Sequence, residues 1–212
     1  MHNIFTVTTV IIANNHEYLK ESIDSALNPL IVYDGIEPLE GDWPMLQCNS
    51  GRPSIAKNLA LFKIEKVPET FIQFLDCDDF LAPNYYDIIT PIIDNNPDYD
   101  FFYTDYSIKN EDYDFINREY VGSIGPEFKR ENFYKIRNPL VRSSVFNKFT
   151  FNDDMSSFEN IDLITKIKRS KCYHIPKDLH TVRLHAKSPS RMINKEEALR
   201  SFNLIDWTKI NG

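Results

Sequence analysis

The feature that most constrains the fold is an unbroken run of mostly β-branched residues near the amino terminus. Residues 6–13 read Thr-Val-Thr-Thr-Val-Ile-Ile-Ala, without an alternation of apolar and charged positions. A strand with one face in water alternates in character, whereas a strand of a parallel sheet, buried on both faces, reads as a continuous run. The sequence therefore predicts a buried strand over residues 5–13 in a parallel sheet.

The segments that follow alternate between helical and extended patterns. Asn14, with Glu17 three residues later, is typical of an N-cap, and a second helix is expected from Pro53. Its buried face is predicted from helical spacing to carry Ile55, Leu59 and Phe62. Strands are expected over residues 30–33, 71–75 and 99–108, a helix over 85–95 disturbed by Pro91, and irregular structure over 36–52. This alternation predicts an α/β, doubly wound sheet.

The second half of the chain is less regular. We expect a strand or hairpin over residues 112–121, helices over 127–136, 158–169 and 195–210, and short strands over 172–175 and 181–185. No repeat, low-complexity tract or linker interrupts the sequence. One domain over residues 1–212 is therefore expected.

Composition limits the class of function. The 212 residues are 42% hydrophobic, with 31 acidic against 24 basic side chains, which provides material for a core and disfavours duplex nucleic acid as a partner. No stretch suits a transmembrane segment, and the amino terminus does not resemble a signal peptide. Cys48, Cys77 and Cys172 are isolated and odd in number, which favours reduced thiols in a cytoplasmic protein over a disulfide framework or a zinc site.

Three carboxylates, Asp76, Asp78 and Asp79, directly follow the buried strand expected at residues 71–75. Ligands of doubly wound sheets bind at the carboxyl ends of the strands, and residues two apart on an extended segment face the same side. Asp76 and Asp78 can therefore converge on Mg²⁺, which takes one or two carboxylates plus substrate phosphates. The alternative is a solvated acidic turn before the helix that follows Pro83. The residues alone leave both interpretations open.

Several motifs, taken in order, resemble those of family-two glycosyltransferases, which have the GT-A fold. The resemblance covers most of residues 4–191 and is carried by residues 6–25, 31–35 (Ile-Val-Tyr-Asp-Gly), 49–60 (Asn-Ser-Gly to Ala-Lys-Asn-Leu-Ala), 74–79 (Asp-x-Asp) and 183–190 (Arg-x-His-x-x-Ser). It implies a GT-A-like single domain with a mostly parallel central sheet and helices on both faces. Residues 1–108 would be the nucleotide-sugar-binding half, and residues 109–212 the acceptor and catalytic half with a C-terminal helix.

The resemblance also implies a role for each matched residue. The nucleotide-sugar-binding positions would be Ala13, Asn14 and Asp34 at the base or ribose, Lys57 near the nucleotide, and Asp76 at the ribose or sugar. Asp78 would bind Mn²⁺ or Mg²⁺, with His185 as a further ligand of metal or diphosphate. Lys57 stands where the family often has Arg, and an ammonium lacks the bidentate fork of a guanidinium.

Each of these residues also has an ordinary structural interpretation. Asp34 before Gly35 fits turn chemistry, Lys57 fits a solvated helix face, and His185 fits an ordinary surface or core histidine. His174 and His180 lie in no matched motif. We interpret both as structural.

The catalytic base is where the sequence departs from the family pattern. Inverting members carry Glu-Asp at the start of a late helix, whereas this chain has Glu159 followed by Asn160. An amide cannot accept the proton of an acceptor hydroxyl. Glu159 and Asp162 are therefore the candidate catalytic residues, with Asp153 and Asp154 as alternatives. Alternatively, Glu159 only stabilises the amino terminus of this helix through its interaction with the helix dipole.

The resemblance thus implies a metal-dependent, inverting glycosyltransferase that transfers a sugar from a nucleoside-diphosphate sugar to an acceptor hydroxyl. The acceptor is left open among a glycan, a lipid-linked sugar, a protein and a modified nucleobase. Two other classes stay open as well: a non-catalytic nucleotide-sugar-binding module, for which Asn160 argues, and a nucleotidyltransferase on a related fold.

Overall fold

A computed structural model describes residues 5–124, 130–186 and 195–208. Its strands are β1 Thr6–Ala13, β2 Pro29–Asp34, β3 Met45–Cys48, β4 Thr70–Asp76, β5 Phe80–Leu81, β6 Phe101–Lys109, β7 Phe115–Glu119, β8 Leu140–Arg142 and β9 Cys172–Arg183. They form a nine-stranded sheet in the order β3-β2-β1-β4-β8-β6-β9-β5, with β7 paired to β6 outside that row. Strands β1, β2, β3, β4, β6 and β9 run in one direction, and β5, β7 and β8 run against them.

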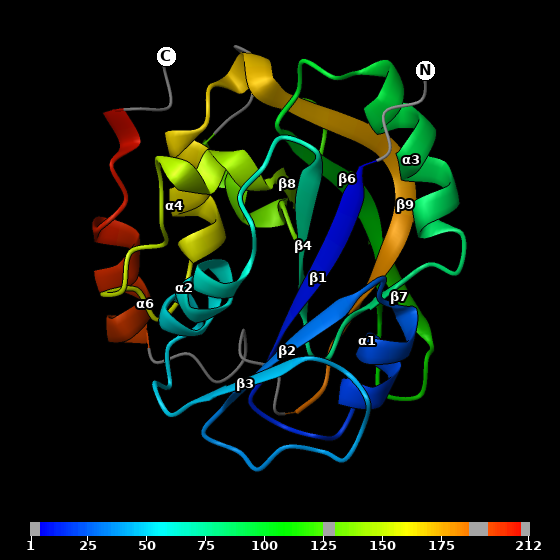
Figure 1. Ribbon diagram of the computed structural model, residues 1–212, viewed down its shortest axis with the longest axis vertical. Coiled ribbons are helices and arrows are strands. Elements are labelled where there is room, and N and C mark those ends of the chain that lie inside the picture. The colour runs from blue at the N-terminus through cyan, green and yellow to red at the C-terminus, as the bar shows by residue number, and fades with distance from the viewer. Residues whose placement is uncertain (1–4, 125–129, 187–194, 209–212) are drawn as a thin grey trace.

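Helices cover both faces of this mostly parallel sheet. They are α1 Leu19–Ser25, α2 Pro53–Lys63, α3 Tyr85–Asn95, α4 Glu159–Lys166 and α6 Lys195–Asn203, with 3₁₀ turns at Arg130–Lys135, Ser143–Asn147 and Arg169–Lys171. Figure 1 shows α2, α4 and α6 on one side of the sheet and α1 and α3 on the other. Two apolar clusters, one per face, contain buried side chains of α2 and α4 and of α1 and α3 respectively. The predicted fold class is confirmed.

The central strand β4 explains why polar groups collect at one edge of the sheet. Thr70 to Leu75 are all buried between β1 and β8, and Phe71 and Phe74 contact aromatic rings on opposite faces. Burying each ring contributes roughly 1.5–3 kcal/mol relative to leaving it in water. The chain becomes polar only where β4 ends, at Asp76.

Two predictions about helix residues are wrong. Helix α1 begins at Leu19 with Tyr18 at its N-cap position, so Asn14 does not cap it and lies instead in the loop after β1. In α2 the buried side chains include Ala56, Lys57 and Ala60, whereas Phe62 is 81% exposed. Small alanines let the helix approach the sheet closely, and this requirement outweighs the spacing of the larger apolar residues.

Other differences concern short or merged strands. The segment predicted to be irregular, residues 36–52, contains β3, and neither β5 nor β8 is predicted. The two strands predicted at residues 172–175 and 181–185 are one continuous strand, β9. The C-terminal helix ends at Asn203, and the predicted positions 209–210, like residues 127–129, lie outside the described residues. In the described part of the chain, no helix has the length and apolar character to cross a membrane.

Candidate functional site

The parallel strands β1, β2 and β4 end together at one edge of the sheet, which we call the carboxyl edge. Ile12 pairs with Asp76, and Ala13 pairs with Tyr33, the residue before Asp34. Strands lie about 4.8 Å apart, so Asp34 and Asp76 flank the end of β1. The structure therefore brings the predicted positions Ala13, Asn14, Asp34 and Asp76 to the same edge, with the side chain of Ala13 fully buried.

Residues 76–79, here called the acidic turn, are held by a hydrogen bond of their own backbone and by two other elements, α1 and β9. The Asp79 amide donates to the Asp76 carbonyl at 3.1 Å and closes the turn. From α1, the Ser22 hydroxyl donates to the Cys77 carbonyl at 2.9 Å, and from β9, Arg183 Nε donates to the Asp78 carbonyl at 3.2 Å. The turn is thus a fixed, packed feature, and the interpretation as a solvated acidic turn is wrong for Asp78 and Asp79, which are 7% and 3% exposed.

Asp78 and His185, the two predicted metal ligands, lie next to each other. Asp78 Oδ2 lies 2.9 Å from His185 Nε2, and the His185 side chain is 2% exposed. His185 follows β9, and its ring contacts Tyr18 with centroids 5.0 Å apart. An imidazole and a carboxylate in this arrangement can both ligate a divalent cation.

The acidic turn concentrates negative charge in a place shielded from water. Burial raises the pKa of Asp76, and the Asp78 carboxylate adds to the rise while Lys57 and Arg137 oppose it. Burial likewise raises the pKa of Asp79 well above its ordinary value, with Asp78 and Asp76 adding to it. A cation bound here would relieve this repulsion.

The acidic turn fits a cation that is shared with a ligand. No group of three or more His, Cys, Asp or Glu side chains able to hold a metal occurs among the described residues. Asp78 and His185 supply two ligands, and Mg²⁺ in proteins takes one or two carboxylates and completes its shell with phosphates and water. The residues therefore suit a cation bridging to a diphosphate and do not suit a cation held by protein alone.

Lys57 lies inside the molecule and joins α2 to the start of α4. Its ammonium donates to Glu159 Oε1 at 2.6 Å and to Asn160 Oδ1 at 3.0 Å, and it sits over the Phe74 and Phe151 rings. With 2% of Lys57 exposed, its interpretation as a solvated helix-face residue is wrong. Burial disfavours the charge on Glu159, but the Lys57 ammonium and its hydrogen bond outweigh burial and lower the pKa of Glu159.

The other candidate bases are held elsewhere. Asp162 is buried and accepts from Lys166 Nζ at 2.6 Å, one turn along the same helix. Asp153 accepts from Asn58 Nδ2 at 2.6 Å, and Asp154 is exposed. Of the candidate bases named from sequence, Glu159 is the one that the structure places against Lys57 and among the charges that act on Asp76.

Asp34 organises the loop that leads into α2. Its carboxylate accepts from the Ser50 amide at 2.6 Å, the Ser50 hydroxyl at 2.8 Å and the Gly51 amide at 3.1 Å. Gly51 has φ +61°, a conformation that glycine adopts without strain. Burial disfavours ionisation of Asp34, but these hydrogen bonds outweigh it and lower the pKa of the carboxyl group.

Arg137 and Asn138, which precede β8, lie at the acidic turn. The sequence does not predict a role for either residue. Arg137 lies near Asp76 and Asp79 and hydrogen-bonds the Tyr106 hydroxyl. Its Nε is buried without a hydrogen-bond partner in the described part of the chain. The one sequence signal at this point is the Asn-Pro pair at 138–139, which is typical of turns and says nothing of a site.

His174 and His180 both lie within β9. His174 Nε2 lies 2.8 Å from Asp105 Oδ1, and His180 Nδ1 lies 3.0 Å from the Thr104 hydroxyl. Burial lowers the pKa of His180 to about 3, so its imidazole is neutral at physiological pH.

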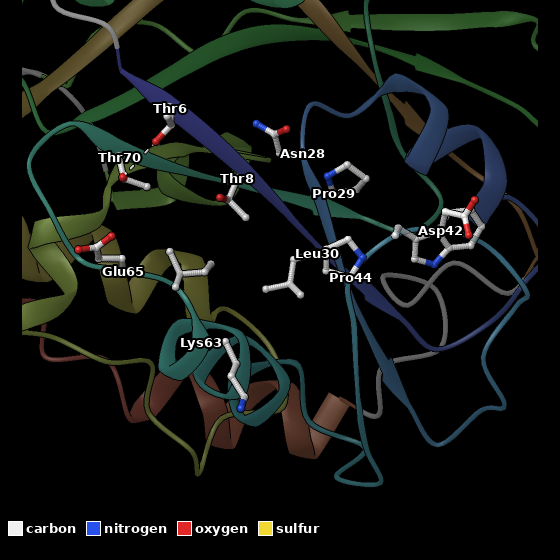
Figure 2. Close-up of a pocket in the computed structure, with 12 residues that line it drawn as sticks. Thr6, Thr8, Asn28, Pro29, Leu30, Asp42, Pro44, Lys63, Glu65 and Thr70 are labelled. Atoms are coloured by element: carbon white, nitrogen blue, oxygen red, sulfur yellow. Dashed lines mark hydrogen bonds between the residues drawn. The ribbon is translucent and has the colours of Figure 1, made fainter.

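A pocket of about 880 Å³ opens at the opposite edge of the sheet. Figure 2 shows it at the amino ends of β1, β2 and β4, with Thr6 and Thr70 joined by a hydrogen bond, Lys63 and Glu65 at the end of α2, and Pro44 and Asp42 across from them. The acidic turn, Lys57 and Glu159 do not line this pocket. We therefore place the candidate site at the carboxyl edge, where the charged groups converge.

No protein-family model matches this sequence, and a search of curated proteins finds no match either. Among solved structures, S. aureus TarS residues 1–349 in complex with UDP-GlcNAc is similar to 90% of this chain, with 15% sequence identity and a TM-score of 0.69. The same TarS segment in complex with UDP gives a TM-score of 0.66 over 88% of this chain at 15% identity, and TarS itself gives 0.66 over 95% at 16% identity. The matches span 62%, 62% and 39% of those TarS chains. At this identity the comparison shows the fold, and the chain has the GT-A-like architecture expected from its motifs.

Proposed function

We propose that this chain is a glycosyltransferase that transfers a sugar from a nucleoside-diphosphate sugar to an acceptor hydroxyl, with a divalent cation at Asp78 and His185. The proposal rests on the contact of Asp78 with His185 at the carboxyl edge, near the buried ammonium group of Lys57 and the buried carboxylate of Glu159. In doubly wound folds this edge is where nucleotides bind. That TarS, which shares the fold, was crystallised with UDP-GlcNAc favours a UDP-sugar as donor.

The proposed donor site has two parts, one at the end of β2 and one at the end of β4. At the β2 end, Asp34 accepts from the Ser50 and Gly51 amides and from the Ser50 hydroxyl, and the loop that it fixes would lie against the nucleoside. At the β4 end, Asp76 would accept hydrogen bonds from ribose or sugar hydroxyls, and Asp78 and His185 would hold Mn²⁺ or Mg²⁺. When bound, the cation would neutralise the charge that develops on the departing diphosphate.

The proposed reaction is a displacement at the anomeric carbon with inversion. The bond from the acceptor oxygen to that carbon forms as the bond to the diphosphate oxygen breaks, and the electron pair of the broken bond stays on the diphosphate. The proton of the acceptor hydroxyl passes to a carboxylate, for which we propose Glu159. Its hydrogen bond to Lys57 keeps it ionised and oriented, although a lowered pKa makes it a weaker base.

A non-catalytic nucleotide-sugar-binding module is the second candidate function. One observation favours it: the Lys57 ammonium donates to both Glu159 and Asn160. Asn160, at the position of the family's base, is an amide, and the adjacent Glu159 carboxylate has reduced basicity because of Lys57. A chain of this kind would bind the donor without turning it over.

A donor panel separates the two functions. Nucleoside diphosphate release from UDP-, GDP- and dTDP-sugars is measured with Mn²⁺ for the wild type and for Glu159→Gln. We expect release from one donor, and a fall of about 10²–10⁴-fold in the variant with donor affinity retained, because general-base catalysis contributes that much. Donor binding with no release by the wild type, for any donor and with a set of sugar acceptors, would favour the binding module.

A further inference from the structure

The side chain of Asn138 bridges the two ends of the acidic turn. Asn138 Oδ1 accepts from the Asp76 backbone amide at 3.3 Å, and Asn138 Nδ2 donates to Asp79 Oδ2 at 2.9 Å. The residue is 5% exposed. A single amide group therefore bridges the first and last residues of the turn, with Asp78 between them.

The backbone of Asn138 is itself held in an unusual conformation. Its φ of +44° lies in the left-handed region, which asparagine tolerates better than most residues other than glycine. Its carbonyl accepts from Gln73 Nε2, and Gln73 Oε1 accepts from the Tyr85 hydroxyl. Strand β4 and helix α3 thus fix the point from which the Asn138 side chain reaches the acidic turn.

The opposite side of the turn is fixed by β9. The Arg183 amide donates to Asp79 Oδ1 at 3.1 Å, so the two oxygens of Asp79 are bonded from two different segments, strand β9 and the residues before β8. With Asp79 held on both sides and the Asp76 amide held by Asn138, the direction in which Asp78 points toward His185 is determined by these contacts. Residues that orient metal ligands from behind in this way typically change metal affinity 10–100-fold when replaced.

We propose that Asn138 is a positioning residue for the candidate cation site, and that it sets the geometry in which Asp78 and His185 bind the metal. This inference rests on the proposed function, because it needs a cation at Asp78. Asn138 itself touches neither the cation nor the reacting atoms.

The test uses Mn²⁺ binding to the full chain saturated with UDP, measured by calorimetry, beside UDP binding in the presence of a chelator. Asn138→Gly keeps the left-handed backbone and removes the bridge. Asn138→Asp keeps shape and the acceptor for the Asp76 amide but sets a carboxylate against Asp79. We expect each variant to bind Mn²⁺ 10–100-fold more weakly than the wild type. The affinity for UDP without metal should stay within about twofold of the wild-type value, because substitutions away from a site change free energies by no more than about 0.5 kcal/mol.

The chain offers a matched control in Asn28. Its φ is +45° and its Nδ2 donates to the Val7 carbonyl at 2.9 Å, at the opposite edge of the sheet. Asn28→Gly makes the same exchange and should leave Mn²⁺ binding unchanged. Wild-type or tighter Mn²⁺ binding by either folded Asn138 variant would overturn the inference alone, whereas no Mn²⁺ binding by the wild-type chain with UDP would overturn the proposed function and the inference with it.

Discussion

At the scale of single residues, the buried ion pair of Lys57 and Glu159 joins helix α2 to the start of helix α4. The two groups are 2.6 Å apart, and their side chains are 3% and 10% exposed. The desolvation of two buried charges offsets much of their attraction, but removing one partner leaves the other buried and uncompensated. Stability should therefore depend on keeping or losing both charges together.

We expect Lys57→Met to lower the free energy of unfolding by about 3–5 kcal/mol at pH 7, and the double variant with Glu159→Gln to recover a large part of that loss. Urea denaturation measures both. The exposed pair Lys20–Asp24, whose side chains are 69% and 59% exposed, is the control, since Lys20→Met should change stability by less than about 0.5 kcal/mol. A double variant whose loss equals the sum of the single losses would contradict this account.

Residue types at the site were predictable from sequence only where a motif carried them. Asp78 and His185 are 107 positions apart; the position of Asp78 after a buried strand suggests a site, whereas His185 is indicated only by its motif. Arg137 and Asn138 precede the three-residue strand β8, which is too short to produce a periodic signal. Asp162 is a candidate base because it is close to Glu159 in sequence, but it lies four residues before Lys166 on the same helix, and the structure pairs these two residues.

At the scale of elements, strands buried on both faces were predicted well and helix faces less well. Strand β1 and residues 70–75 of β4 carry no charged side chain and are mostly β-branched or apolar, so their burial follows from their residue types. The buried face of α2 depends on how close the helix comes to the sheet, and that distance is set by Ala56 and Ala60 and by the internal partner of Lys57. None of these is visible in the spacing of Ile55, Leu59 and Phe62.

Edge strands show the same limit. Strand β3 pairs with β2 alone, and its residues alternate between exposed and half-buried. Proline and glycine residues flank β3 in the sequence, and their local preferences favour a loop at this point. Such strands form because a neighbouring strand offers unpaired backbone groups, which is a property of the assembled sheet.

At the scale of the whole molecule, His180 makes stability depend on pH. Its pKa falls from an ordinary value of 6.5 to about 3 on folding because burial disfavours the imidazolium. Below pH 6.5 the unfolded chain therefore binds a proton that the folded chain does not. The stabilisation is present in full above pH 6.5 and is lost as the pH falls toward 3.

Between pH 7 and pH 5 this effect should lower the free energy of unfolding by about 2 kcal/mol, at 1.36 kcal/mol per pKa unit. His180→Asn retains a group able to bond the Thr104 hydroxyl but cannot titrate. Chemical denaturation at both pH values should show a smaller loss for this variant than for the wild type. Equal losses in the two proteins would show that His180 does not control stability in this pH range.

Calorimetric titration of the protein with UDP-GlcNAc, in the presence of Mn²⁺ or of a chelator, tests whether the carboxyl edge binds a nucleotide sugar through a divalent cation at Asp78. We expect the wild type to bind at least about tenfold more tightly with Mn²⁺, because the metal links the diphosphate to the acidic turn. Asp78→Asn should lose this dependence while remaining folded, and Asp87→Asn, at an exposed position on α3, should keep it. Equal affinity with and without chelator across a panel of nucleotide sugars, in a folded wild-type protein, would contradict the account.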